Sequence, residues 1–173
     1  MTKPLPYSEP LRLHQIGAGL NRTLEPTAEE RARIAKSLDL VSLDSFTTEL
    51  TVTPTVSGWR IDGRVKAELV QACGLTLEPV PDSINQTFLV NLTEQPYEPE
   101  TDENGEIDLE LEDDFPDVVE DGRIDLGQYA VEQLALTLNP FPRKEGAVFE
   151  QPPEPVELSP FAVLKSLKDD SKG

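Results

Sequence analysis

Two adjacent basic residues, Arg143 and Lys144, follow a rigid turn that reads Pro-Phe-Pro. Pro142 fixes its own φ angle, so the turn presents the next side chains in a defined direction. Exposed Lys and Arg side chains supply many of the contacts that proteins make to nucleic-acid phosphates. We therefore predict that Arg143 and Lys144 contact RNA or the ribosome.

A second candidate site lies near the C-terminus, in the run Pro160-Phe161-Ala162-Val163-Leu164-Lys165-Ser166-Leu167-Lys168. Phe161, Leu164 and Leu167 recur every three residues, which places them on one side of a short helix. This segment follows a Pro- and Glu-rich linker, so it has no core of its own. It either docks back onto the sheet or enters the groove of a partner protein. We predict that Phe161, Leu164 and Leu167 bind a partner.

Residues that commonly carry catalysis are scarce. His14 is the sole histidine, so it is the one residue that could serve as the base of a Ser-His-Asp or Cys-His arrangement. Cys73 is the sole cysteine, and its place at a strand end favours a small buried side chain over a nucleophile. Residues 100–111 resemble a calcium loop, but Leu111 stands where a bidentate Glu is needed. We expect no enzyme activity, no cofactor and no metal site.

Acidic residues are concentrated in one part of the chain. The formal net charge is −18, and residues 94–125 contain 15 acidic residues and one basic residue, a net charge of −14. The rest of the chain therefore carries −4, so contact with nucleic acid elsewhere is not excluded. Residues 94–121 contain several prolines and clusters of carboxylates, and their sequence has almost no helix or strand periodicity. We therefore expect a flexible acidic insertion there.

Length and composition predict one folded unit. The chain has 173 residues, 37% of them hydrophobic, and 16 prolines, so a sizeable part lies outside a core. We expect a single α+β domain over residues 1–147 and a Pro/Glu-rich linker with a short amphipathic tail over residues 148–173. No signal-peptide pattern or membrane-length apolar run is present. We expect a cytoplasmic protein without membrane or DNA partners.

Two helices have readable ends. Thr27 and Glu30 form a capping box, which predicts a helix from Ala28 to about Leu38. Its thin apolar stripe should lie on a sheet and consists of Ala28, Ala32, Ala35, Ile34 and Leu38. Asp125 with Gln128 predicts the start of a second helix, and Asn139 is expected in the left-handed conformation after it. The apolar face of this helix comprises Leu126, Ala130, Leu134 and Leu138, with Val131 and Ala135 beside them.

Period-two alternation predicts the sheet. Residues 9–16 suit a short strand and residues 20–25 an extended segment. From Asp44 to Val56 the apolar residues occupy even positions, and after the Ser57-Gly58 turn they occupy odd positions up to Leu69. The intervening charged residues should face water, and Gly63 suggests a bulge.

A third strand is expected to begin at Leu75 and Leu77, to break at Pro79 and Pro81, and to resume from Ile84 to Leu92. Three alternating runs with short turns indicate an antiparallel meander. The expected fold is an antiparallel β-meander sheet with the two helices packed on one face.

Three motifs then occur in a familiar order. They are Ile124-Asp125-Leu126-Gly127 continuing through Glu132-Gln133-Leu134-Ala135-Leu136, then Asn139-Pro140-Phe141-Pro142-Arg143-Lys144, and Pro160-Phe161-Ala162-Val163-Leu164. With these motifs the chain resembles the YceD-like family of large ribosomal RNA subunit accumulation proteins, and most closely its alphaproteobacterial branch. The resemblance covers most of the chain. It implies a role in the synthesis, processing or accumulation of large-subunit ribosomal RNA, without a known catalytic site.

The resemblance also bears on Cys73. Many family members carry Cys-x-Arg-Cys at this turn, but here Val70 and Ala72 stand where the first Cys and the Arg would be. A metal or redox role for such a pair is therefore not expected. The resemblance implies a non-enzymatic ribosome biogenesis factor whose partner is large-subunit ribosomal RNA or a pre-ribosomal particle. The alternative is an acidic adaptor or chaperone that holds a basic ribosomal protein through residues 94–125.

Overall fold

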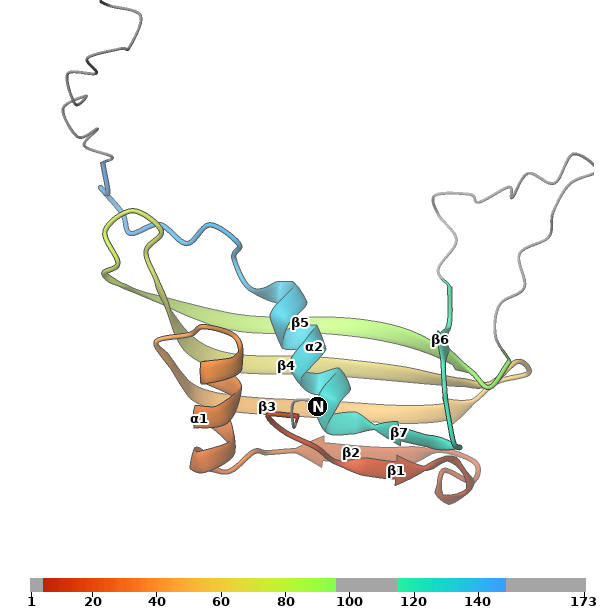
Figure 1. The fold of residues 1–173 in the computed structure, drawn as a ribbon. Helices are drawn as coiled ribbons and strands as arrows, with labels where there is room; N and C mark the ends of the chain where they lie inside the picture. The colour runs from red at the N-terminus through yellow and green to blue at the C-terminus, as the bar shows by residue number, and fades with distance from the viewer. Residues whose placement is uncertain (1–4, 96–114, 149–173) are drawn as a thin grey trace, which may run out of the picture.

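The computed structural model describes residues 5–95 and 115–148. Phe161, Leu164, Leu167 and most of the acidic insertion lie outside the described residues. Figure 1 shows a long curved sheet with both helices on one face. The elements are β1 (Pro10–Arg12), η1 (Leu13–Gln15), β2 (Leu20–Leu24), α1 (Ala28–Ser37), β3 (Ser42–Pro54), β4 (Trp59–Ala72), β5 (Pro79–Thr93), β6 (Asp117–Val118), β7 (Arg123–Asp125) and α2 (Leu126–Thr137).

The main sheet has the strand order β2-β3-β4-β5-β6. The pairs from β2 to β5 are antiparallel, whereas β6 pairs with β5 in parallel over two residues. A second, two-stranded sheet joins β1 to β7. The predicted α+β fold with an antiparallel meander is confirmed.

The two faces of the sheet differ as the alternation predicts. Residues at even positions of β3 pair with residues at odd positions of β4, for example Val52 with Ile61, and both are fully buried. The other face carries ion pairs between Lys66 and Glu49 and between Arg60 and Asp62, each at 2.9 Å. Exposed ion pairs of this kind contribute little to stability. Burial of apolar side chains on the helix-covered face therefore provides most of the stabilisation of the sheet.

The prediction of a bulge at Gly63 is wrong. The register of β3 with β4 is continuous through Gly63, and its one irregularity lies between Leu43 and Ser45. A Cβ atom on Gly63 would lie 2.2 Å from Cζ of Phe88, so the glycine makes room for this aromatic ring on the neighbouring strand. Val56 was expected in the buried series but is fully exposed, because β3 ends at Pro54.

The third strand also differs from the expectation. β5 runs without a break through Pro79 and Pro81, while Leu75 and Leu77 belong to the turn before it. Among the described residues, β6 reaches β5 only at Leu92 and Thr93. The rest of β5 therefore has an open edge, where a proline removes no ladder hydrogen bond.

Helix α1 starts as predicted but buries less of its stripe than predicted. The Thr27 side chain accepts from the Glu30 amide, and the Glu30 carboxylate accepts the Thr27 amide at 2.8 Å. Ile34 and Ala35 are buried against the sheet. Ala28 and Ala32 remain exposed, because the contacts of the helix with the sheet are mainly to β3.

Helix α2 buries Leu126, Ala130, Val131 and Leu134 as predicted, whereas Ala135 is exposed. Asp125 is the N-cap, but Gln128 does not complete a capping box, because its side-chain amide donates to Glu132 at 2.8 Å. Asn139 does not adopt the left-handed conformation. The chain leaves the helix through Leu138, which is already extended.

The N-terminal segment crosses the start of α2. Residues 9–16 form a three-residue strand and a 3-10 helix, instead of one longer strand. The Asp125 carboxylate accepts from the Glu9 amide at 2.8 Å and from the Ser8 hydroxyl at 2.5 Å, and the Leu126 amide donates to the Glu9 carbonyl. Tyr7 is buried beside these contacts. Asp125 therefore both caps α2 and fastens the N-terminal segment to it.

Candidate functional site

The segment of residues 139–148 follows α2 without helix or strand, yet it is held in place. The Gly74 amide donates to the Pro142 carbonyl at 2.9 Å, and the Gln71 side chain donates to the Asn139 carbonyl at 3.0 Å. The Lys144 amide points to Sγ of Cys73 at 3.4 Å. These contacts fix the 139–148 segment against the turn between β4 and β5.

The two predicted basic residues have different surroundings. The Lys144 ammonium group donates to the Glu78 carboxylate at 2.5 Å, and the hydrogen bond and charge of Lys144 lower the pKa of Glu78. Arg143 is exposed and forms no ion pair or hydrogen bond with any described residue. Arg143 is therefore the uncompensated cation of the pair. The pairing of Lys144 was not foreseeable from spacing, since 66 residues separate it from Glu78.

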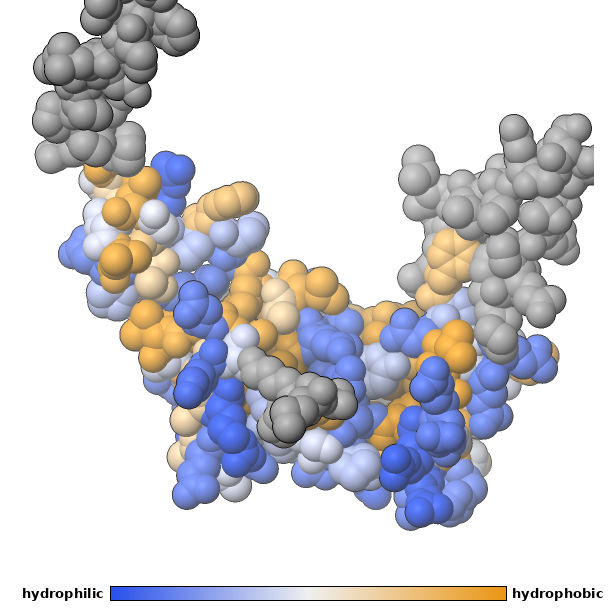
Figure 2. Space-filling view, viewed as in Figure 1, coloured by the Kyte–Doolittle hydropathy of each residue, from blue (hydrophilic) through white to orange (hydrophobic). Residues whose placement is uncertain are grey.

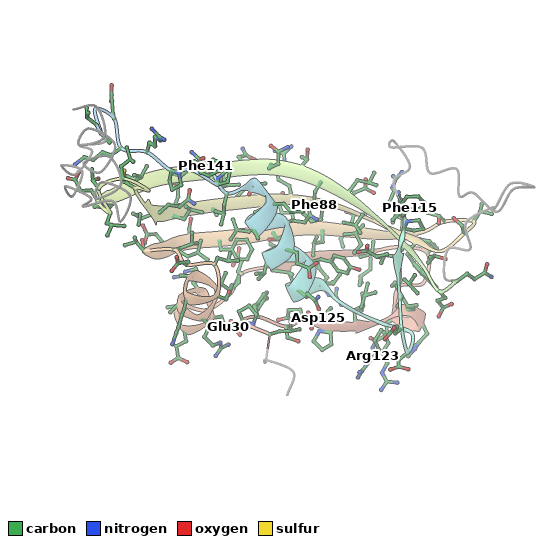
Figure 3. All side chains as sticks on the ribbon, turned by 45° about the horizontal axis from the view of Figure 1, so that its top comes forward. Glu30, Phe88, Phe115, Arg123, Asp125 and Phe141 are labelled. Carbon is green, nitrogen blue, oxygen red and sulfur yellow. The ribbon has the colours of Figure 1, made fainter. Side chains whose placement is uncertain are left out.

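Phe141 is a residue that the sequence reasoning did not select. Its amide donates to the Asn139 side chain at 3.0 Å, and its own side chain is 78% exposed. Leu77 on the β4–β5 turn and Val148 are similarly exposed. Figure 2 shows hydrophobic surface gathered at this end of the molecule, and Figure 3 places Phe141 there. Prolines on both sides of Phe141 are the signal that could have indicated a displayed side chain.

Cys73 lies beneath this segment and is fully buried, as expected. The Lys144 amide, the Thr76 hydroxyl and the amides of Leu75 and Thr76 lower the pKa of its thiol to about 6. Hydrogen bonds that point at sulfur favour the thiolate. The Cys73 sulfur thus accepts hydrogen bonds from the turn and from the 139–148 segment and joins the two.

We expect this acceptor to make stability depend on pH. The folded-state pKa lies below the unfolded value of about 8.5, so the contribution is full above that value and is lost as the pH falls through 6. The difference in unfolding free energy between the wild type and Cys73→Ser should therefore grow from pH 5 to pH 9. Urea denaturation at several pH values measures it. A difference that does not vary with pH would contradict the lowered pKa.

The described acidic residues Asp117 of β6 and Glu120 after it lie at the end of the sheet far from Phe141 (Figure 1 and Figure 3). Figure 3 shows Phe115 and Arg123 at the end far from Phe141. A pocket of about 490 Å³ there is lined by residues of β6, β7 and α2, including Asp117, Glu120 and Glu132. The Tyr129 hydroxyl donates to Asp117 at 3.1 Å, and burial together with this carboxylate raises the pKa of Tyr129. Within the described part of the chain no three acidic, His or Cys side chains are grouped as a metal site.

Comparison with known proteins gives one match. The family model described as large ribosomal RNA subunit accumulation protein YceD matches residues 61–168, which is more than half of the chain. The matched range begins in β4 and includes α2 and the 139–148 segment. The comparisons with curated proteins and with solved structures gave no match. Among the described residues, no helix is long and apolar enough to cross a bilayer.

Proposed function

The chain belongs to the YceD family of large ribosomal RNA subunit accumulation proteins, and we propose that it is a non-enzymatic ribosome biogenesis factor. It supports the processing or accumulation of large-subunit ribosomal RNA in the bacterial cytoplasm. The family match carries this proposal, because it spans the acidic segment, helix α2 and the 139–148 segment together. The partner is large-subunit ribosomal RNA or a pre-ribosomal particle.

Arg143 is the residue through which we propose that contact is made. Its guanidinium is exposed and uncompensated, whereas the charge of Lys144 is already matched by Glu78. The 139–148 segment is held by hydrogen bonds to Gln71, Cys73 and Gly74. Its backbone is therefore already ordered, and binding costs little further conformational entropy. The described acidic residues Asp117 and Glu120 lie at the other end of the sheet (Figure 1). Beyond a Debye length of about 8 Å at physiological salt, their repulsion of phosphate is largely screened.

We expect Arg143→Glu to weaken association with pre-ribosomal particles about tenfold at physiological salt, since a reversed charge repels the phosphates that it faced. Arg64→Glu is the matched control. Arg64 is an exposed arginine on the uncovered face of the sheet, and replacing it should change association little. Sucrose-gradient co-sedimentation with quantified protein measures both variants. Equal losses for the two variants would indicate a general charge effect and overturn the assignment of Arg143.

The second candidate is the acidic adaptor for a basic ribosomal protein. The carboxylates around the pocket between β6 and α2 favour it, because a Lys or Arg side chain could enter there. Replacing the carboxylates of residues 94–121 by Ser and Asn separates the two functions, with Asp125 kept because it caps α2. The adaptor would lose its partner, whereas a factor that acts through Arg143 would keep its association with the particle.

A further inference from the structure

Strand β5 has a free edge along most of its length. Apart from Leu92 and Thr93, which pair with β6, its outer edge has no strand partner among the described residues. The stretch from Ile84 to Leu92 contains no charged residue and no proline. Sheets usually protect such an edge with charges, prolines or bulges, because its unpaired N–H and C=O groups can pair with another chain. This edge is therefore suited to the addition of a strand.

Hydrogen bonds near the two ends of β5 show which residues face the open edge. The Glu78 carbonyl accepts from the Cys73 amide on the β4 side, whereas the Thr93 carbonyl accepts from the Val119 amide on the outer side. Backbone groups alternate in direction along a strand, so the odd-numbered residues of β5 direct their N–H and C=O groups outward. Pro79 and Pro81 occupy such positions, where a missing N–H leaves the ladder with β4 intact.

Between Pro81 and Thr93, five residues direct their backbone groups to the open edge: Ser83, Asn85, Thr87, Leu89 and Asn91. The Ser83 amide donates to the Asp82 side chain at 2.8 Å, and the other four amides have no acceptor in the described part of the chain. The prolines limit this stretch at one end and β6 limits it at the other. At about 3.3 Å per residue, residues 83–91 form a slot about 30 Å long.

The side chains beside the slot favour an occupant with alternating polarity. Ile84, Phe88 and Val90 face the helix-covered side and are half-buried at the margin of the core. Every second side chain of an added strand would lie next to them, where an apolar group buries further surface. The intervening side chains would lie on the uncovered face beside Asn85 and Thr87, which are exposed and polar.

The uncovered face of the neighbouring strands is close to neutral. Its basic residues Arg60, Arg64 and Lys66 are balanced by Asp62, Glu68 and, on β3, Glu49. Two of these cations already form ion pairs within that face. Charges at the ends of the slot and on the molecule as a whole therefore decide which occupant is attracted.

Those charges favour a cationic occupant. Asp82 lies at one end of the slot, and Glu94 and Asp117 lie at the other. The net charge of −18 attracts a basic segment and repels a second copy of the chain. A second β5 strand is also poorly matched, because its 15 residues exceed the slot and would run into β6.

We propose that the edge of β5 between Pro81 and Thr93 binds an extended, cationic peptide segment of another protein as an added antiparallel strand. Its apolar side chains lie beside Ile84, Phe88 and Val90, and its basic side chains lie on the uncovered face. Antiparallel pairing is slightly more stable per residue than parallel pairing and continues the order of β2 to β5. The binding needs neither RNA nor Arg143, so it does not rest on the proposed function.

Fluorescence anisotropy with the full chain and a labelled peptide of about eleven alternating Lys and Val residues tests the proposal. In antiparallel pairing the lysine side chains lie on the uncovered face, and the lysine N–H groups point toward β5. Backbone N-methylation of the lysines should therefore weaken binding at least about tenfold, because it removes several hydrogen bonds. N-methylation of the valines, whose N–H groups point away from β5, should change binding less than about twofold.

Equal binding of the two N-methylated peptides would show that charge alone holds them and would overturn the proposal. Absence of binding by the unmodified peptide would overturn it as well. Both methylated peptides carry the same charges and side chains as the unmodified one, so each serves as a control for the other.

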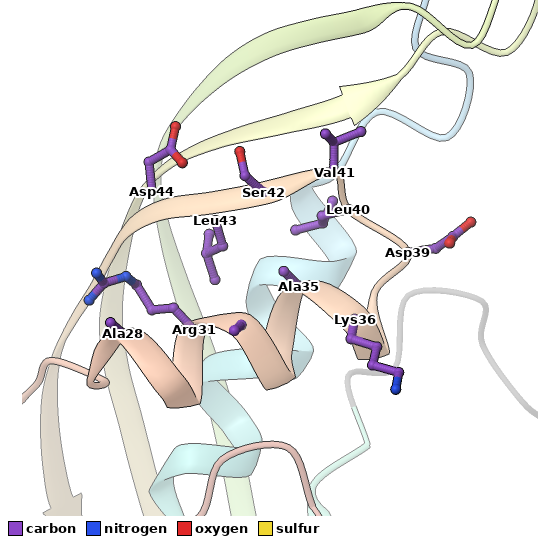
Figure 4. A pocket seen from close by; sticks show the side chains of 11 residues that line it. Ala28, Arg31, Ala35, Lys36, Asp39, Leu40, Val41, Ser42, Leu43 and Asp44 are labelled. Carbon is purple, nitrogen blue, oxygen red and sulfur yellow. The ribbon is translucent and has the colours of Figure 1, made fainter.

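Leu89→Lys locates the binding on the protein. Leu89 is 46% exposed on β5, and a lysine there would face the lysines of the peptide, so binding should weaken about fivefold. Val41→Lys is the matched control, because Val41 is 58% exposed and lies just before β3, with β4 between β3 and β5. Figure 4 shows its side chain directed away from α1, so the substitution leaves the core undisturbed. Val41→Lys should weaken binding less than about twofold.

Equal weakening by the two lysine substitutions would overturn the assignment to β5. Sedimentation velocity on the protein without peptide should show a monomer. A dimer that Leu89→Lys dissociates would also overturn the proposal, because a second copy would then be the occupant of the edge.

Discussion

Gly127→Ala is expected to lower the unfolding free energy by about 2–3 kcal/mol. Gly127 lies in the first turn of α2, where alanine would ordinarily stabilise a helix by about 1 kcal/mol. Here a Cβ atom would lie 2.8 Å from the Glu9 amide nitrogen and 3.0 Å from two backbone atoms of Ser8. The N-terminal segment would have to move away from the helix, because backbone atoms cannot rotate aside.

That movement would break several contacts at once. The Asp125 carboxylate would lose the Glu9 and Ser8 donors, the pairing of β1 with β7 would weaken, and Tyr7 would become exposed. Each lost hydrogen bond costs about 0.5–1.5 kcal/mol. Chemical denaturation measures the total loss of unfolding free energy. Faster proteolysis within residues 5–12, or stronger quenching of Tyr7 fluorescence, would show that the loss arises in the N-terminal segment.

Gly74→Ala is the matched control for Gly127→Ala. A Cβ atom there would meet the Pro142 carbonyl oxygen at 3.7 Å, an ordinary contact, so stability should change little. A Gly127→Ala protein as stable as the wild type would show that the N-terminal segment does not depend on close approach to α2.

Gly58→Ala is expected to lower the unfolding free energy by about 3–4 kcal/mol. A loss of this size exceeds that of most single substitutions and needs a specific structural cause. Gly58 has φ +153°, a region that other residues adopt only at a cost of about 1–3 kcal/mol. In addition, a Cβ atom would lie 1.9 Å from the Leu92 carbonyl oxygen. The β3–β4 turn and the end of β5 would have to separate.

The damage should extend to the acidic end of the molecule. Leu92 and Thr93 pair with β6, and the Val119 amide donates to the Thr93 carbonyl at 2.7 Å. Hydrogen exchange at Val119 should therefore accelerate in Gly58→Ala. Gly17→Ala is the control, because Gly17 has φ +57° but no atom within 4 Å of the added Cβ. If both variants lose the same stability, the clash at Leu92 contributes nothing.

Local signals determined the elements that the sequence could predict. The capping pair Thr27 and Glu30 specifies where α1 starts, because both bonds lie within four residues. Alternation of Val52 and Ile61 with polar neighbours specifies which face of β3 and β4 is buried, because the strand period is two. The three motifs likewise indicated the family, and the family match over residues 61–168 confirms it.

Errors arose where a residue distant in the chain decides the outcome. Gly63 looked like a bulge, yet it accommodates Phe88 from the next strand. Pro79 and Pro81 looked like strand breakers, yet they lie on the open edge of β5. Neither the neighbour of a glycine nor the position of a strand at an edge is encoded in the local pattern.

The sequence by itself determined the fold class, the helix starts, the buried face of the sheet and the presence of Arg143 and Lys144 on a rigid turn. Tertiary structure alone decided that Lys144 pairs with Glu78 while Arg143 stays uncompensated, and that the N-terminal segment packs against Gly127. The physical reason is range. Capping and periodicity act within one or two turns of chain, whereas charge pairing and close packing act between residues that only folding brings together.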